Sequence, residues 1–212
     1  KIDRVDVMER DGKSYLRVID YKTGTKTFSL DEVYCGLNTQ MLLYLFTLCS
    51  NASDVYKNSV AAGVLYLAGD PPPQDAGRAE AARPPAYRMD GIVLDDAAVV
   101  RGMDRDATGL FVPFSFSKNC APRAGAKLAS MEKLGAIERH ISGLVLEMAR
   151  GLYAGEIEAA PLRTRGHSPG DACDYRPGCL HEDGRGETYV SAPKHVFEPG
   201  ADEMPAKGGA GE

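Results

Sequence analysis

The chain has 212 residues, a hydrophobic content of 43%, a charged content of 26% and a formal net charge of −5. This length suits a single domain with a well-filled core, and no apolar run approaches the roughly 18 residues that a membrane span needs. The negative charge excludes a global attraction to nucleic acid, so DNA binding would require a local basic cleft or metal ions that neutralise the phosphates.

The start of the chain and its cysteines indicate its setting. The sequence begins with Lys1 rather than Met, and no charged-then-apolar leader precedes the first strand pattern, so we expect a piece cut from a larger protein. Five cysteines, an odd number, without a secretion signal do not resemble a disulfide framework. We therefore expect a reducing, cytoplasmic compartment.

The first half of the chain shows strand and helix patterns in turn. Residues 1–22 predict a β-hairpin, because apolar segments flank Asp11-Gly12, and Asp-Gly is a strong signal for a tight turn. A capping box at Ser29 and Glu32 precedes a predicted buried helix over 30–49. The patterns that follow predict a strand over 60–69, an exposed loop over 71–85, a strand over 87–94 and a short helix over 94–104.

The second half contains one long amphipathic helix, predicted over 130–155. Its apolar residues recur at three- and four-residue spacing: Leu134, Ile137, Ile141, Leu144, Met148 and Leu152. The order of elements predicts an α/β (α+β) fold, with a central mixed sheet that a β-hairpin opens and that helices flank. We expect the folded core over 1–165, a cysteine-bearing loop of the same domain over 166–190, and a disordered tail over 191–212.

The hairpin predicts a cluster of charged side chains. A two-residue Asp-Gly turn sets Arg10 opposite Lys13, and the same ladder continued sets Asp3 opposite Asp20. Two facing carboxylates repel each other unless a cation lies between them, and Mg²⁺ prefers such oxygen ligands. Lys22 shares the face of Asp20 because strand side chains alternate. The alternative is an ordinary strand in which Asp3 merely faces water.

The residues of this cluster occur in a wider pattern. The stretches "KIDRVD" and "LRVIDYKTG", followed by "GLNTQMLLYL", resemble the PD-(D/E)XK nuclease domain of the RecB type, and within that type the C-terminal domain of AddB-type proteins. The resemblance extends to about residue 190, since "GLYAGEIEAAPLR" and "ACDYRPGC" fit the end of that domain. It implies a restriction-endonuclease-like fold.

The resemblance also implies roles for individual residues. Asp3 and Asp20 match the two metal-binding acids, and Lys22 matches the catalytic lysine. Gln40 and Tyr44 match the Q-x-x-x-Y motif, which is implicated in holding DNA and supporting the site. The spacing alone equally allows Gln40 to face solvent and Tyr44 to belong to the core.

Two departures from the family pattern affect the cofactors. The family's histidine lies upstream of the first strand, before Lys1, so we expect an incomplete metal site. A [4Fe–4S] cluster in such domains uses an upstream cysteine and a C-x2-C-x5-C run. Cys173 and Cys179 match the C-x5-C half as vestigial cluster ligands, but Gly170 stands at the earlier position. We therefore expect no cluster in this chain.

The remaining cysteines and histidines suggest little chemistry. His167 and His181 flank the vestigial pair, so zinc is an alternative, although the irregular spacing argues against it. Cys35 and Cys49 fall within the predicted buried helix and are expected to be small core residues, and Cys120 has no evident partner in the sequence.

The resemblance implies a Mg²⁺-dependent DNA exonuclease, with Mn²⁺ as a substitute metal, in a complex that processes double-strand breaks for recombination. Its partners would be DNA and an AddA-type helicase-nuclease. The alternative is a non-catalytic scaffold or DNA-holding module in the same complex. We also expect the chain by itself to self-associate and to cleave DNA weakly or not at all, because without the family's upstream helix apolar surface would be left uncovered.

Overall fold

The computed structural model covers the whole chain, and the parts of it that are described begin with the hairpin and end near the C-terminus. The described residues are 1–24, 26–51, 56, 58–69, 89–106, 109, 111–114, 116–117, 122, 127–157, 160–164, 173–178, 182 and 184–198. The loop expected over 71–85 and the tail from 201 onward lie outside them. Within the described residues, no helix is long and apolar enough to cross a membrane.

The predicted hairpin is present and consists of two antiparallel strands, β1 (Arg4–Arg10) and β2 (Lys13–Lys22). Asp11 and Gly12 form the turn with φ values of 51° and 72°. Positive φ at both central positions is the geometry that lets a two-residue loop follow the twist of its strands. The predicted register is also present, because Arg10 pairs with Lys13 and Arg4 with Ile19.

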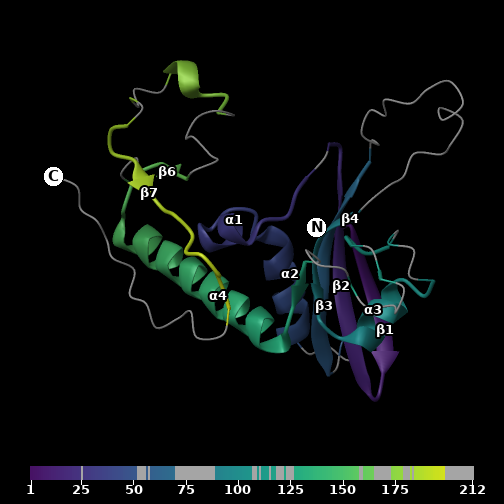
Figure 1. Cartoon of the computed structure of the whole chain (residues 1–212). Coiled ribbons are helices and arrows are strands. Elements are labelled where there is room, and N and C mark those ends of the chain that lie inside the picture. Colours follow the sequence, from purple (N-terminus) through teal and green to yellow (C-terminus); the bar gives the residue numbers. More distant parts are fainter. Residues whose placement is uncertain are drawn as a thin grey trace, which may run out of the picture. The chain divides into compact units, whose positions relative to one another are not determined.

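The hairpin begins a mixed five-stranded sheet in the order β1-β2-β3-β4-β5 (Figure 1). β3 runs parallel to β2, β4 antiparallel to β3, and β5 parallel to β4. The bounds of the three further strands are Ser59–Ala68, Met89–Leu94 and Leu128–Ala129. The predicted α+β class with a mixed sheet and flanking helices is thus confirmed.

Helices cover both faces of this sheet, with α2 (Gln40–Ser50) on one side and α3 (Ala97–Met103) on the other (Figure 1). The core on the α3 side consists of Ile19, Leu65, Val93, Val100, Val112 and Phe114. α3 begins at Asp96, whose carboxylate accepts the backbone N–H groups of Ala98 and Val99. An acid at this position satisfies donors that the first turn of a helix leaves free.

The single helix predicted over 30–49 is wrong, because the chain forms two helices there: α1 (Leu30–Tyr34) and α2. Between them Gly36 has a φ of 81° and Asn38 a φ of 54°. Left-handed residues end an α-helix, and Gly and Asn adopt that conformation most readily. The continuous apolar pattern concealed this break.

The long helix α4 (Met131–Ala154) is confirmed in extent, but its apolar stripe is buried only in part. Leu134, Ile137 and Ile141 are at most 2% exposed, whereas Met148 is 58% exposed and Leu152 is 78% exposed. The prediction of a helix with one buried face therefore fails for its second half.

The chain divides into two compact units, Lys1–Ser29 with Thr39–Glu138, and Leu30–Asn38 with Arg139–Glu212. The first contains the five-stranded sheet. In the second, the rings of Tyr34 and His140 stack with centroids 4.9 Å apart, and β6 (Leu162–Arg163) pairs with β7 (Thr188–Tyr189). The short helix η2 spans Arg176–Gly178. The expected boundaries at 165 and 190 remain predictions.

Candidate active site

The candidate site lies where β2 ends, and it begins with the position of Asp3. This residue directly precedes Arg4, the first residue of β1, so the observed ladder continued by one pair sets it opposite Asp20. The backbone N–H of Tyr21 donates to Asp3 Oδ2 over 3.1 Å. The Asp3 carboxylate is therefore held against the end of β2, next to Asp20.

Asp20 and Lys22 share one face of β2, and their side chains form an ion pair between Asp20 Oδ2 and Lys22 Nζ. The two side chains are 22% and 38% exposed. Although Lys22 opposes its charge, Asp20 Oδ2 is buried and accepts no hydrogen bond of acceptable geometry. A buried carboxylate oxygen with only a charge partner can still accept a donor or a cation.

The neighbouring strand adds an aromatic ring to this face. Tyr66 of β3 pairs with Asp20 in the parallel ladder, and its ring centroid lies 5.9 Å from Lys22 Nζ. The end of β2 is also tied to β3, because the Gly69 N–H donates to the Lys22 carbonyl over 2.6 Å. Lys22 is thus restrained through its backbone, its carboxylate partner and the ring beside it.

The donor set suits a hard divalent cation. Asp3 and Asp20 offer carboxylate oxygens from adjacent strands, and one of those oxygens has no hydrogen bond. Mg²⁺ is commonly held by one or two carboxylates and keeps several waters. Among the described residues there is no cluster of three or more His, Cys, Asp or Glu side chains that could hold a metal ion. The two acids therefore fit Mg²⁺ only as a water-rich site.

Gln40 and Tyr44 lie one turn apart on the first two turns of α2. Gln40 Nε2 donates to Tyr44 Oη over 2.8 Å, with Gln40 exposed and Tyr44 half-buried. α2 packs against β2 and β3, the strands that carry Asp20 and Tyr66. The structure thus brings the motif residues together with each other, and their role toward DNA stays a prediction.

A second charged cluster, which the sequence reasoning missed, supports the segment after Lys22. Lys127 Nζ lies 2.7 and 2.8 Å from the two Asp90 carboxylate oxygens and donates to the Phe28 carbonyl over 2.9 Å. The Phe28 N–H in turn donates to Asp90 Oδ2 over 2.7 Å. Asp90 pairs with Tyr66, so Asp20, Tyr66 and Asp90 form one row across three strands.

No local signal could have identified this cluster, because its members are far apart in the sequence. Phe28 and Asp90 are 62 residues apart, and Phe28 and Lys127 are 99 apart. The only hint was a charged residue within an otherwise apolar strand, since Asp90 precedes Gly91, Ile92 and Val93. We name this group the Asp90–Lys127 clamp.

The cysteines show no metal site within the described residues. Cys173 is exposed with a free thiol, while Cys179, His167, His181, Gly170 and Cys120 lie outside those residues. Cys35 lies between α1 and α2 rather than within a helix, contrary to expectation. Burial, and then the charge of Glu138, raise the pKa of Cys49 to about 11, so this thiol stays protonated at neutral pH.

A sheet of this topology, with two acids and a lysine where the second strand ends, defines a class of metal-dependent nucleases. Residues 1–180 match the family model for the PD-(D/E)XK nuclease superfamily, so the chain belongs to that superfamily.

The curated relatives narrow this class further. The chain is similar to the B-type subunits of ATP-dependent helicase/deoxyribonucleases, with 31% identity to the protein of Clostridium acetobutylicum over 90% of the chain. Identity is 34% to the protein of Moorella thermoacetica over 86% of the chain, and 35% to that of Symbiobacterium thermophilum over 84%. The chain spans only 17%, 17% and 16% of the lengths of these three relatives.

Proposed function

We propose that the chain is the nuclease domain of a helicase-nuclease and that it hydrolyses DNA phosphodiesters as an exonuclease during double-strand break processing and recombination. The observation that carries this proposal is the arrangement at the end of β2. Asp20 and Lys22 are paired on one face, and Asp3 is hydrogen-bonded to the residue between them. Membership of the nuclease superfamily supports it.

The residues of the site would divide the work of phosphodiester hydrolysis. Mg²⁺, or Mn²⁺ in its place, held by Asp3 and Asp20, would supply a Lewis acid and an activated water. Lys22 brings a positive charge to the same face, where it would stabilise negative charge that develops on the phosphate oxygens. Gln40 and Tyr44 would support the DNA from the start of α2.

We further propose that the partner is an AddA-type helicase-nuclease that feeds a single DNA strand to this domain. The relatives' names, which combine an ATP-dependent helicase with a deoxyribonuclease, support this assignment. No [4Fe–4S] cluster is expected, so the purified protein should be colourless, and a metal analysis should find no stoichiometric iron.

The second candidate is a PD-(D/E)XK scaffold that holds DNA without cleaving it. The absence of a third acid or histidine beside Asp3 and Asp20 among the described residues favours this alternative. Titration calorimetry with Mg²⁺ or Mn²⁺ separates the two. Binding heat that Asp20→Ala removes supports the nuclease, whereas a silent titration of the wild type supports the scaffold.

The direct test is a nuclease assay on the natural full-length protein. Asp20→Ala and Lys22→Ala should each lower the rate of DNA cleavage by roughly 100-fold or more, because each removes a metal ligand or a charge that acts in the transition state. Lys13→Ala is the matched control, since Lys13 is an exposed lysine at the other end of β2. Cleavage at the wild-type rate by either site variant would refute the proposal.

A further inference from the structure

A groove opens on the face of the sheet opposite to Asp20, where the first strands end. Its volume is about 480 Å³, within the usual range for ligand pockets. Arg4 and Tyr21 contribute from the hairpin, Met89 from β4, and Phe111 from the segment after α3. We name it the Tyr21 groove. It shares a strand end with the candidate active site, because Tyr21 lies between Asp20 and Lys22.

Two aromatic side chains border this groove and remain accessible. Tyr21 is 47% exposed and Phe111 is 48% exposed. Phe111 is also held by its backbone, since its carbonyl accepts a hydrogen bond from Arg17 Nη1 over 3.3 Å. Aromatic side chains in this state are good stacking partners for unpaired nucleic acid bases, because every base has a π-face.

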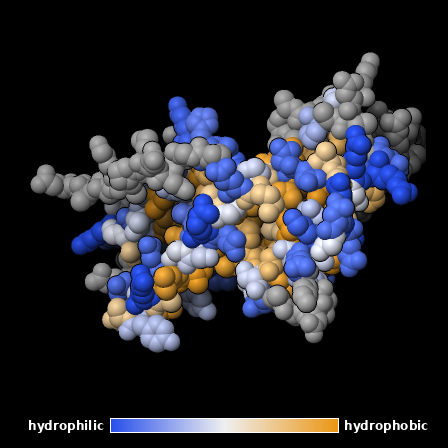
Figure 2. All heavy atoms as spheres, turned by 90° about the horizontal axis from the view of Figure 1, so that it is seen from below, coloured by the Kyte–Doolittle hydropathy of each residue, from blue (hydrophilic) through white to orange (hydrophobic). Residues whose placement is uncertain are grey.

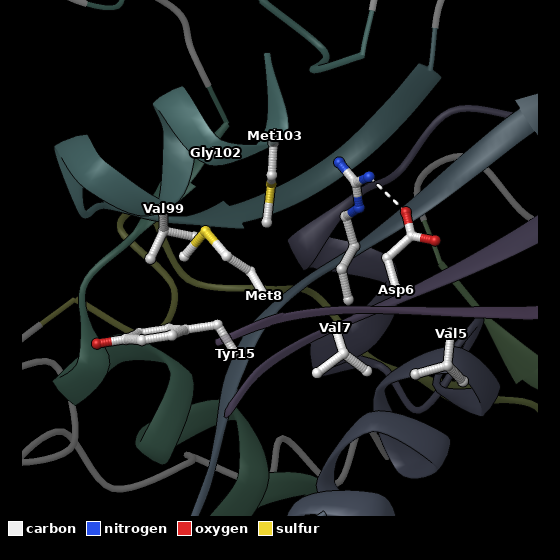
Figure 3. Close-up of a pocket in the computed structure, with 9 residues that line it drawn as sticks. Val5, Asp6, Val7, Met8, Tyr15, Val99, Gly102 and Met103 are labelled. Carbon is white, nitrogen blue, oxygen red and sulfur yellow. Dashed lines mark hydrogen bonds and ion pairs between the residues drawn. The ribbon is translucent and has the colours of Figure 1, made fainter. Parts of the chain in front are cut away.

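The charges beside the rings favour an anion. Arg4 Nε lies 2.6 Å from Asp6 Oδ1, and Arg17 Nη2 pairs with Asp6 Oδ2. Figure 3 shows the Asp6 carboxylate pointing to the guanidinium with which it pairs. Two guanidinium groups and one carboxylate leave one positive charge in excess at the groove.

Arg17 also has an unused donor. Its side chain is only 10% exposed, and Arg17 Nε has no hydrogen-bond partner among the described residues. The residue lines both the Tyr21 groove and a second cavity of about 380 Å³ beside Met8, Val99 and Met103 (Figure 3). A buried N–H without an acceptor is costly, so an incoming phosphate oxygen would find a ready donor here.

From these observations we infer that the Tyr21 groove binds a nucleotide of single-stranded DNA, with its base against Tyr21 or Phe111 and its phosphate near Arg4 and Arg17. This inference rests on the proposed function, because it supplies a holding site for the strand whose phosphodiester is cleaved on the other face. A duplex would bind less well, since its bases are already stacked and paired.

The test measures binding of a fluorescent oligonucleotide to the natural full-length protein in EDTA, so that cleavage does not interfere. Tyr21→Ala should raise the dissociation constant for single-stranded DNA roughly 5- to 100-fold, the loss of one stacked base. Tyr21→Phe keeps the ring and should bind like the wild type. Tyr153→Ala removes a tyrosine that is 96% exposed on α4 and is the matched control.

A second variant tests the phosphate contact. Arg4→Gln should weaken binding and reduce the slope of log affinity against log salt by about one, as expected for one lost phosphate contact. Arg185→Gln is the control, because Arg185 is also an exposed arginine in an ion pair, with Glu182. An oligonucleotide with photoreactive bases should crosslink to Tyr21 or Phe111.

The outcomes separate this inference from the proposed function. A wild-type protein that neither binds nor cleaves DNA would overturn both. A protein that cleaves single-stranded DNA, but in which Tyr21→Ala and Phe111→Ala bind as tightly as Tyr153→Ala, overturns the groove inference alone.

Discussion

Asp6 is the residue that holds the arginines of the Tyr21 groove in place. It accepts hydrogen bonds from Arg4 and from Arg17. Burial alone would raise the pKa of Asp6, but the two guanidinium groups outweigh burial and hold that pKa below its ordinary value of 3.8. Asp6 is therefore ionised at neutral pH, and its charge contributes to the stability of the hairpin.

Asp6→Asn should lower the free energy of unfolding by roughly 1–3 kcal/mol at pH 7, because two charge-assisted hydrogen bonds lose their anion. A lowered folded-state pKa means that this stabilisation is present above the unfolded pKa and is lost as the pH falls through the folded one. The gap between wild type and variant should therefore narrow below about pH 4.

Urea unfolding at pH 7 and at pH 3 checks this expectation. Asp11→Asn serves as the control, because Asp11 is exposed at the turn and its ion pair with Arg10 should contribute about 0.5 kcal/mol or less. A gap between wild type and Asp6→Asn that stays constant over this pH range would contradict the assigned role of Asp6.

Among the elements, the break between α1 and α2 places the start of α2 at Gln40. Gly36 has a φ of 81°, and a Cβ there would meet no atom closer than 3.7 Å. The reason for glycine at this position is therefore backbone conformation rather than lack of space.

Gly36→Ala should lower the free energy of unfolding by about 1 kcal/mol, because alanine is strained at positive φ. Gly143→Ala is the matched control within α4, where a Cβ meets nothing within 4 Å, and it should instead raise stability by about 0.5–1 kcal/mol. Thermal unfolding of both variants measures the difference. Equal effects of the same sign would show that the left-handed turn is not what glycine provides.

The Asp90–Lys127 clamp joins β4 and the start of β5 to the segment that follows Lys22. Asp90→Ala should speed the hydrogen exchange of the Phe28 amide, which loses its acceptor. Lys127→Met should lower the free energy of unfolding by about 1–3 kcal/mol, because it leaves a partly buried carboxylate without its cation.

Lys194→Met is the control for the clamp, since Lys194 is an exposed lysine near the C-terminus. Native-state hydrogen exchange gives a residue-level measurement that a general loss of stability would not mimic, because it would report Phe28 before the core strands. Unchanged exchange at Phe28 in Asp90→Ala would mean that the clamp does not restrain this segment.

At the scale of the whole molecule, apolar side chains remain on the surface. Figure 2 shows orange hydrophobic side chains between blue hydrophilic ones on one face. Val7 of the edge strand β1 is 46% exposed, and Leu152 near the end of α4 is 78% exposed. Exposed apolar surface and open strand edges tend to become covered by another protein surface.

The 212-residue chain is therefore expected to self-associate at micromolar concentration, as light scattering coupled to gel filtration would show. Leu152→Lys and Val7→Lys each place a charge on one of the two exposed surfaces, so the variant that restores the monomer identifies the contact. A wild-type chain that is monomeric at every concentration would contradict this prediction.

Much of the hairpin could be predicted from the sequence because its interactions are local. The Asp11-Gly12 turn sets the register between strands that are adjacent in the chain, and that register alone places Asp3 beside Asp20. Alternation along β2 then puts Lys22 on the face of Asp20. No information from distant residues was needed for these positions.

The remaining features depended on segments that meet only in the folded chain. An apolar run cannot reveal a break such as the one at Gly36 and Asn38, nor can helical periodicity tell that α4 is buried at Ile141 and exposed at Leu152. The Asp90–Lys127 clamp and the Tyr21 groove likewise join residues from separate strands and loops. The sequence by itself determined the local pairing of the two acids and the lysine, since a tight turn leaves one register. Only the tertiary structure decided what supports and surrounds them, because those contacts depend on how the sheet and helices pack.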